Sequence, residues 1–295
     1  MKTLIIIGNG FDIGHKLKSK FEDFGIFLRD NNEELFNAIV FLLENPNEII
    51  ISPINYFKRF EEMLQYLFLN NIIEYDAIQI NSLYEEMIDE EIGPISYRDI
   101  ESHYQPQYLK TKNNLIKGII EYYEMWIGEI NEDIYNHKKN LKPFYQQLIE
   151  DTQNKILSFN HTDTIEELYN RENIVHIHGR YSVGDKLIVG HKSKNYNIEY
   201  EEDSVVAQFY KSVDLIIEKN KKILESYNDI AQIYVIGCSL SDVDMPYFIK
   251  ISSVAAEAMW NIVYFNEKQK QEFKDIIENN LQIKYKLIPS DKVYC

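Results

Sequence analysis

Short, continuous apolar runs separated by helical patterns constrain the fold of this chain more than any other feature. The first run, Leu4–Ile7, is mostly β-branched and stops at Gly8-Asn9-Gly10, as a buried strand does when it enters a tight glycine turn. Helical patterns, notably 205–224 and 246–258, separate most of the later runs. The later runs are Lys155–Phe159, Ile174–Ile177, Lys186–Val189, Ile233–Ile236, Asn261–Phe265 and Ile283–Ile288. This alternation predicts an α/β fold, a parallel sheet with helices on both faces.

The segment from about residue 30 to residue 150 has a different pattern. Apolar residues repeat at helical spacing in stretches such as Tyr56–Leu64 and Leu115–Ile130. We therefore predict a large all-helical insertion after the first strand, with residues 30–150 as one domain and residues 1–29 together with 151–295 as the sheet domain. The aromatic residues from Phe57 to Phe68 fit a helical core better than an oligomer interface, and both interpretations stay open.

Charge and cysteine content disfavour several classes of protein. Asp and Glu outnumber Lys and Arg by 47 to 31, and the net charge of -16 repels a phosphate backbone, which disfavours bulk nucleic-acid binding. Cys238 and Cys295 are too few for a disulfide framework and are typical of a reducing compartment. The first residues carry one positive charge and too short an apolar run for a signal peptide or a membrane span. We expect a cytoplasmic protein without a membrane segment.

The loops that follow the predicted strands are the places to look for chemistry. In an open parallel sheet, ligands bind beyond the carboxyl ends of the strands. The loops after Ile7, Phe159, Ile177, Ile236 and Phe265 are therefore expected to converge on one crevice.

The first of these loops contains three glycines, Gly8, Gly10 and Gly14, between a strand and a helix expected from about Asp12. Glycine lets a backbone approach a ligand closely, and amides at a helix start favour phosphate. The spacing differs from the dehydrogenase motif, and no second strand ending in an acid follows about 20 residues on, so a hydride-transferring dehydrogenase is disfavoured. A tight turn that binds nothing is an equal alternative.

The loop after Phe159 is rich in polar and ionisable residues, with Asn160, His161 and Asp163 in close succession. This is where an α/β site expects such groups. Asp163 fits the cap of a helix over 164–169 better than a catalytic acid.

Two histidines, His176 and His178, flank Ile177, so in an extended strand both rings point to one face. Either is a candidate general base because the pKa of histidine lies near neutral pH, and at least one is expected only to satisfy buried polar groups. The pair could instead bind a metal together with His161 or His191. No HExxH motif, cysteine pair or dense carboxylate cluster accompanies it, so we predict no metal.

The loop after Ile236 resembles a nucleophile elbow that lacks its final glycine, because Ser241 stands at that position. Cys238 fits a small buried thiol better than a nucleophile. Gly237 and Ser239 can instead offer a backbone amide and a hydroxyl to a phosphate or ribose. Asn266 is placed either to hydrogen-bond a ribose or to cap a helix.

Taken together, these motifs resemble the abortive-infection AbiH family of phage-defence proteins. The resemblance is carried, in family order, by Leu4–Asp12, Leu17–Phe24, Phe159–Thr164, His176–Gly179 and Gly237–Asp242. The same series is similar to the sirtuin-like, Rossmann-like NAD-binding fold, with its glycine loop, asparagine motif, histidine-glycine motif and Gly-x-Ser motif. It implies that residues 1–29 and 151–295 form a sirtuin-like nucleotide-binding domain.

The sirtuin-like resemblance also implies roles for single residues. Asn160 matches the asparagine that positions water or ribose, and His178 matches the catalytic histidine. Gly237 and Ser239 match NAD contacts, and Asn266 matches the asparagine that binds the adenosine ribose. The chain lacks the zinc-binding cysteine quartet, which disfavours a protein deacetylase.

The activity that follows is NAD glycohydrolysis, in which NAD is the substrate and no cofactor is needed. Gly8, Asn9, Gly10 and Asp12 would wrap the dinucleotide. Asp163 would join them, although it lies three residues after its asparagine rather than the two of the sirtuin pattern. A homo-oligomer or a defence-system partner protein is expected to control such an activity.

Two other classes of function stay open. One is a binding module that senses a nucleotide or an ADP-ribose derivative and signals to a partner. The other is a metal-dependent hydrolase that uses His161, His176 and His178.

Overall fold

The computed structural model describes residues 2–43, 52–60, 64, 97–190 and 211–293. Two compact units are present. The sheet unit comprises Met1–Lys20, Trp126–Ile188 and Lys211–Cys295, and the helical unit comprises Phe21–Met125 and Val189–Tyr210. The domain boundaries that the sequence predicts, at residues 29 and 150, stay a prediction.

The sheet unit contains a six-stranded, all-parallel sheet, so the predicted α/β class is confirmed. The strand order is β3-β2-β1-β4-β5-β6, with Ile6 of the first strand in register with Leu157 on one side and Val235 on the other. This is the order of doubly wound dinucleotide-binding sheets. The strands are β1 (Thr3–Ile7), β2 (Lys155–Ser158), β3 (Val175–His176), β4 (Gln232–Ile236), β5 (Met259–Tyr264) and β6 (Lys284–Pro289).

Most apolar runs of the sequence are strands, but two depart from the prediction. Run 174–177 yields only the two residues of β3. Run 186–189 is wrong as a strand: it is loop, and the backbone N–H of Ile188 donates to the carbonyl oxygen of His178 at 2.8 Å. Its apolar character reflects burial of Leu187 in a loop rather than pairing in the sheet.

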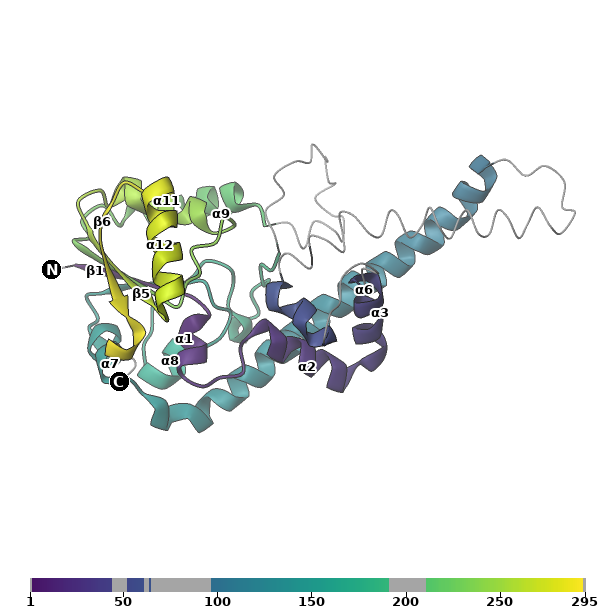
Figure 1. The fold of residues 1–295 in the computed structure, drawn as a ribbon, viewed down its shortest axis with the longest axis horizontal. Coiled ribbons are helices and arrows are strands. Elements are labelled where there is room, and N and C mark those ends of the chain that lie inside the picture. Colours follow the sequence, from purple (N-terminus) through teal and green to yellow (C-terminus); the bar gives the residue numbers. More distant parts are fainter. Residues whose placement is uncertain (1, 44–51, 61–63, 65–96, 191–210, 294–295) are drawn as a thin grey trace, which may run out of the picture. The chain divides into compact units, whose positions relative to one another are not determined.

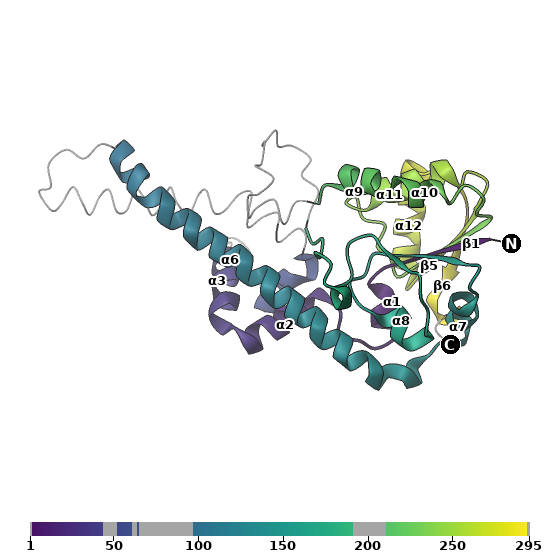
Figure 2. The ribbon, with the colours of Figure 1, turned by 180° about the vertical axis from the view of Figure 1, so that it is seen from behind.

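Helices cover both faces of the sheet, as predicted (Figures 1 and 2). On one face, Ile6 of β1 belongs to a buried cluster with Phe248 and Phe273. On the other face, the ring of Tyr234 in β4 meets that of Phe144, with centroids 5.9 Å apart. The helices of this unit are α1 (Gly10–Gly14), α7 (Pro143–Glu150), α8 (Thr164–Tyr169), α9 (Val213–Lys219), α10 (Lys221–Glu225), α11 (Met245–Val254) and α12 (Glu267–Asn280), with the short η3 (Tyr135–Asn140), η4 (Tyr181–Val183) and η6 (Ser290–Lys292).

Helix predictions in this unit hold with small shifts, with one correction. The pattern 205–224 corresponds to α9 and α10, although residues 205–210 lie outside the described part of the chain. The first helix does not begin at Asp12. It begins at Gly10 with Asn9 at the N-cap, and it is only five residues long.

The described part of the helical unit consists of helices, as predicted, and its aromatic residues form a core. Phe57 and Phe60 are fully buried, and Phe60 stacks on Tyr123 with ring centroids 5.7 Å apart. The core interpretation of these two residues is therefore confirmed, whereas Phe68 lies outside the described residues and the oligomer interface stays a prediction. The helices are α2 (Phe21–Asn31), α3 (Glu33–Leu43), η1 (Pro53–Arg59) and α6 (Tyr97–Ile134), the last of which continues into the sheet unit (Figure 2).

Among the helices that the structure describes, none combines the length and apolar character needed to cross a membrane.

Candidate functional site

The glycine turns after β1 and β4 pack against each other. The N–H of Gly8 donates to the carbonyl oxygen of Ile236 at 3.0 Å, and the N–H of Gly10 donates to that of Gly237 at 2.9 Å. Gly237 has a φ of +71°, and a Cβ atom there would lie 2.3 Å from the backbone nitrogen of Phe11. These glycines are therefore required by the contact between two backbones.

The backbone amides that were predicted to bind a phosphate are engaged in this contact. The N–H groups of Gly8 and Gly10 are engaged with the β4 loop, and that of Phe11 donates to the carbonyl oxygen of Gly8 at 2.9 Å. The side-chain amide of Asn9 donates to the carbonyl oxygen of Ser19 at 2.6 Å. The tight-turn interpretation describes this segment well, while its contact with a dinucleotide stays a prediction.

The β4 loop presents one buried and one exposed side chain. Cys238 is buried, as expected, and burial raises the pKa of its thiol well above the ordinary value, which disfavours a nucleophile. Ser239 is exposed. Its hydroxyl is available to a ligand.

Asn160 joins the β2 loop to the β1 turn. Its side-chain amide donates to the carbonyl oxygen of Gly8 at 3.2 Å, and its backbone N–H donates to the hydroxyl of Ser158 at 3.1 Å. The side chain has few accessible atoms, since the residue is 8% exposed. The loops after three neighbouring strands, β2, β1 and β4, thus meet at one point.

Asp12 is a buried carboxyl group directly beside this point. It is 1% exposed, and its Oδ2 accepts a hydrogen bond from the Thr162 hydroxyl at 2.7 Å. Its Oδ1 accepts none from the described residues. Burial raises the pKa of Asp12 to about 6, although Thr162 and Asn160 oppose the shift. A buried carboxyl with such a pKa is a frequent mark of a functional site.

His178 lies in an apolar and aromatic environment. Its ring stacks on Phe159 with centroids 5.1 Å apart, and its Nε2 lies 3.3 Å from the hydroxyl of Tyr247 in α11. Burial and the charge of Lys211 lower the pKa of His178 well below its ordinary value. The imidazole is therefore neutral near pH 7 and is able to accept a proton.

A second buried histidine and an ion pair accompany His178. His161 lies with its ring centroid 6.4 Å from that of His178, and burial lowers the pKa of His161 to about 4. Lys211 is 3% exposed, and its Nζ lies 2.6 Å from the carboxylate of Asp244. The Lys211 charge also lowers the pKa of both histidines.

His176 and His178 do not share a face, which corrects the prediction. The strand ends at His176, and the chain turns so that Ile177 enters the core. His176 binds Glu166 of α8 with its Nε2 at 2.8 Å, whereas His178 faces Tyr247 of α11. The assumption of an extended strand through all three residues was wrong.

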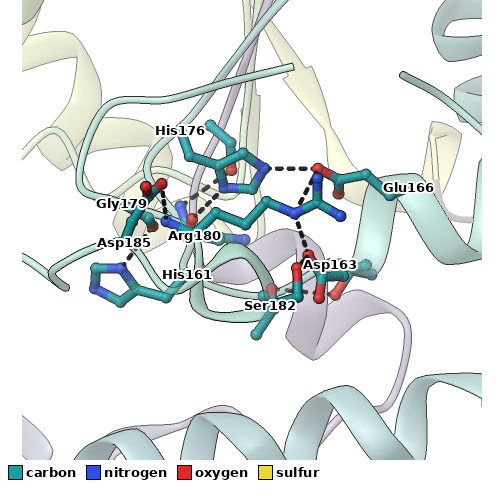
Figure 3. A network of polar contacts seen from close by, with 12 residues as sticks. His161, Asp163, Glu166, His176, Gly179, Arg180, Ser182 and Asp185 are labelled. Atoms are coloured by element: carbon teal, nitrogen blue, oxygen red, sulfur yellow. Dashed lines mark hydrogen bonds and ion pairs between the residues drawn. The ribbon is translucent and has the colours of Figure 1, made fainter. Parts of the chain in front are cut away.

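Asp163 occupies the N-cap position of α8, but its side chain does not cap the helix. Its carboxylate is 7% exposed and accepts hydrogen bonds from Asn131 at 2.8 Å, from Ser182 at 2.8 Å and from Arg180 (Figure 3). Arg180 also lies 3.4 Å from Glu166. Asp163 thus lies at the centre of a charged network, and its contact with NAD stays a prediction.

The family model for bacteriophage abortive infection AbiH matches residues 4–265 of the chain. The chain belongs to the AbiH family. The resemblance to this family seen in the motifs is confirmed. Membership indicates a part in anti-phage abortive infection. A search of curated proteins finds no match. The sirtuin-like character of this AbiH chain stays a prediction.

One predicted residue of the AbiH site has a clear local role. Asn266 is the N-cap of α12, and its Oδ1 accepts a hydrogen bond from the backbone N–H of Gln269 at 2.9 Å. The cap alternative is therefore confirmed. This hydrogen bond lies within α12, and the contact of Asn266 with a ribose stays a prediction.

Metal binding by the AbiH chain gains no support from the residues that can be described. They contain no group of three or more His, Cys, Asp or Glu side chains arranged to hold a metal ion. His161, His176 and His178 instead have separate partners, and His191 lies outside the described residues.

The sequence did not predict three residues that lie near His161 and His178, namely Lys211, Asp244 and Tyr247. Lys211 and Asp244 lie in segments without a recognisable motif, so no local signal identifies them. Tyr247 follows Pro246 at the start of a helix and looks like an ordinary core residue. Only the folded chain reveals their positions beside His178.

Proposed function

We propose that the chain is an NAD glycohydrolase, which cleaves NAD to nicotinamide and ADP-ribose. The bond between nicotinamide and ribose breaks through a transition state with positive charge on the ribose. Because nicotinamide already leaves from a cationic ring, no strong acid is needed. The protein has to orient the ribose, stabilise charge and deliver water.

One observation carries this proposal: the contact of the Asn160 side chain with the carbonyl oxygen of Gly8 at 3.2 Å. This contact lies at the carboxyl end of β1, next to the position where the strand order reverses between β1 and β4. Ligands of doubly wound sheets bind at such a position. An amide there is suited to hydrogen-bond a ribose hydroxyl or a water molecule.

His178 supplies the base in this proposal. The neutral imidazole accepts a proton, although its lowered pKa makes it a weak base at pH 7. Its two contacts, to Phe159 and Tyr247, are both long at 3.3 Å, so neither holds a ring nitrogen tightly. The exposed hydroxyl of Ser239 provides a group for the phosphate or ribose.

The test is incubation of the purified protein with NAD, followed by chromatography for nicotinamide and ADP-ribose. His178→Ala and Asn160→Ala should each lower kcat by about 100-fold or more, the usual contribution of a positioned proton acceptor. His137→Ala removes a half-buried histidine paired with Asp133 and should keep full turnover. Retained NAD hydrolysis in well-folded His178→Ala protein would contradict the assignment.

A nucleotide-sensing module is the second candidate, and the burial of the polar groups favours it. Asn160 and His178 are 8% and 3% exposed, and their side chains are hydrogen-bonded within the protein. A sensor needs only binding. Calorimetry that detects tight binding of NAD or ADP-ribose without product formation would support the sensor over the enzyme.

A further inference from the structure

His176 lies between the candidate site and the charged network of Asp163. Its Nδ1 is 2.8 Å from the carbonyl oxygen of Asn160, and its Nε2 is 2.8 Å from Oε1 of Glu166 (Figure 3). The side chain of His176 is 4% exposed and that of Glu166 is 11% exposed. His176 thus connects the Asn160 backbone to α8 in a region that water reaches poorly.

Both partners of the His176 ring are hydrogen-bond acceptors. A carbonyl oxygen and a carboxylate cannot donate, so both ring nitrogens must carry a proton for both bonds to exist. The doubly protonated ring is the imidazolium cation. Glu166 raises the pKa of His176 despite the opposing effect of burial, which agrees with this protonation state.

The charges around His176 alternate in sign. Glu166 faces its Nε2, Arg180 follows at 3.4 Å from the same carboxylate, and Asp163 binds Arg180 in turn. The charge of His176 also acts on two titratable groups of the β2 loop and α1, His161 and Asp12. The chain of four alternating charges is balanced only while His176 is protonated.

We propose that His176 is a positioning residue, which as an imidazolium clamps the backbone of Asn160 to Glu166 and so aims the Asn160 amide at the β1 turn. The importance of that aim for NAD hydrolysis rests on the proposed function, whereas the clamp itself does not. When His176 loses its proton, one of the two hydrogen bonds is lost. The Asn160 side chain is then less firmly held, whereas an amide that binds a ribose needs a fixed position.

Nuclear magnetic resonance of the Asn160 side-chain amide tests the clamp without any substrate. In the unmodified protein, this resonance should titrate with the midpoint of His176, above pH 6.5. Glu166→Gln keeps an acceptor but removes the charge, so the midpoint should move to lower pH. Glu167→Gln removes an exposed charge of the same helix and should leave the midpoint in place. An unchanged midpoint in Glu166→Gln would overturn the proposal.

Two substitutions of His176 separate the clamp from simple packing. His176→Asn keeps a donor near the position of Nδ1, whereas His176→Phe keeps an aromatic ring and has no donor. The Asn160 resonance should therefore move less in His176→Asn, which loses only the bond to Glu166, than in His176→Phe, which loses both bonds. An Asn160 resonance identical in His176→Phe and the unmodified protein would overturn the proposal.

NAD turnover supplies the second readout. His176→Phe should lower kcat by about tenfold, His176→Asn should recover part of this loss, and Glu166→Gln should move the basic limb of the pH profile to lower pH. If no form of the protein hydrolyses NAD while the Asn160 resonance behaves as expected, the clamp stands and the proposed function fails. If NAD is hydrolysed with the same pH profile in Glu166→Gln, the clamp fails and the proposed function stands.

Discussion

At the scale of single residues, the glycines of the first turn illustrate how one motif supports two interpretations. A glycine is required wherever a backbone approaches closely, whether the approaching group is a phosphate or another chain segment. Gly8 and Gly10 approach the turn at Gly237, with bonds of 3.0 and 2.9 Å to the β4 end. The sequence identifies the need for glycine, and the tertiary structure identifies the neighbour.

Replacing Gly237 by alanine should lower the free energy of unfolding by about 3 kcal/mol or more. The change places a side chain in the left-handed region, which costs about 1–2 kcal/mol, and forces a Cβ to 2.3 Å from the Phe11 nitrogen. Gly184→Ala is a matched control: its φ is +75° but no atom lies within 4 Å of the added Cβ. Urea denaturation measures both. Equal losses in the two variants would contradict a contact between the two turns.

Asp12→Asn should change how stability depends on pH. The folded protein keeps the Asp12 proton up to a pKa of about 6, whereas the unfolded chain loses it near the model-compound value of 3.8. The folded state binds more protons between these values, so ionisation of Asp12 lowers stability as pH rises, by about 3 kcal/mol in total. Asn does not ionise, so the variant should gain on the order of 1 kcal/mol relative to the unmodified protein between pH 5 and pH 8.

Urea denaturation at the two pH values measures this difference for Asp12→Asn. Asp275→Asn, an exposed carboxylate of α12, controls for the removal of one negative charge. If the difference in stability between Asp12→Asn and the unmodified protein is the same at pH 5 and pH 8, the pKa of Asp12 is not raised in the folded protein.

At the scale of elements, α8 was predicted correctly in position but not in the role of its first residue. The helix runs over Thr164–Tyr169, and Asp163 is at its N-cap position. The aspartate side chain instead binds Asn131, Arg180 and Ser182. Local sequence indicates where a helix begins, but residues 17 to 32 positions away decide what the cap side chain binds.

Asp163→Ala should destabilise the protein by roughly 3 kcal/mol, because it leaves the Asn131 amide without its acceptor and Arg180 with only the longer contact to Glu166. Asp185→Ala also removes a carboxylate that binds Arg180, but Asp185 is exposed and accepts from the Arg180 backbone, so the loss should be below about 1 kcal/mol. Thermal unfolding compares them. If Asp163→Ala keeps its stability and instead raises the KM for NAD, its predicted contact with NAD is favoured over the network role.

At the scale of the whole molecule, net charge and strand order constrain function in opposite ways. The strand order favours a dinucleotide, while the charge of -16 repels the anionic pyrophosphate. The backbone amides of Gly8, Gly10 and Phe11 donate to carbonyl oxygens of the protein. They therefore offset the repulsion of a pyrophosphate less than the sequence suggested.

For the proposed NAD glycohydrolase, salt should therefore help NAD to bind. Raising NaCl from about 20 mM to about 200 mM screens the protein field, and the KM for NAD should fall by about twofold. Nicotinamide riboside lacks the phosphates and is a cation, so its KM should rise over the same range. Initial rates of nicotinamide release measure both trends. A rise in KM for both substrates would indicate that a local cation such as Lys211 outweighs the net charge.

The sequence alone determined the α/β class, most strands, the helical character of the described insertion and the family. These features depend on the spacing of apolar residues and on short motifs, and both can be recognised from neighbouring residues of the sequence. It could not determine that run 186–189 is a loop, because a buried loop residue and a buried strand residue are equally apolar.

The tertiary structure alone decided which groups meet at the candidate site. Asn160 reaches Gly8 across 152 positions of sequence, and His178 reaches Tyr247 across 69. His176 and His178, two positions apart, bind different helices because the strand ends between them. Such contacts depend on strand order and on where each strand stops, and their energies arise from burial and charge between segments that the sequence keeps far apart.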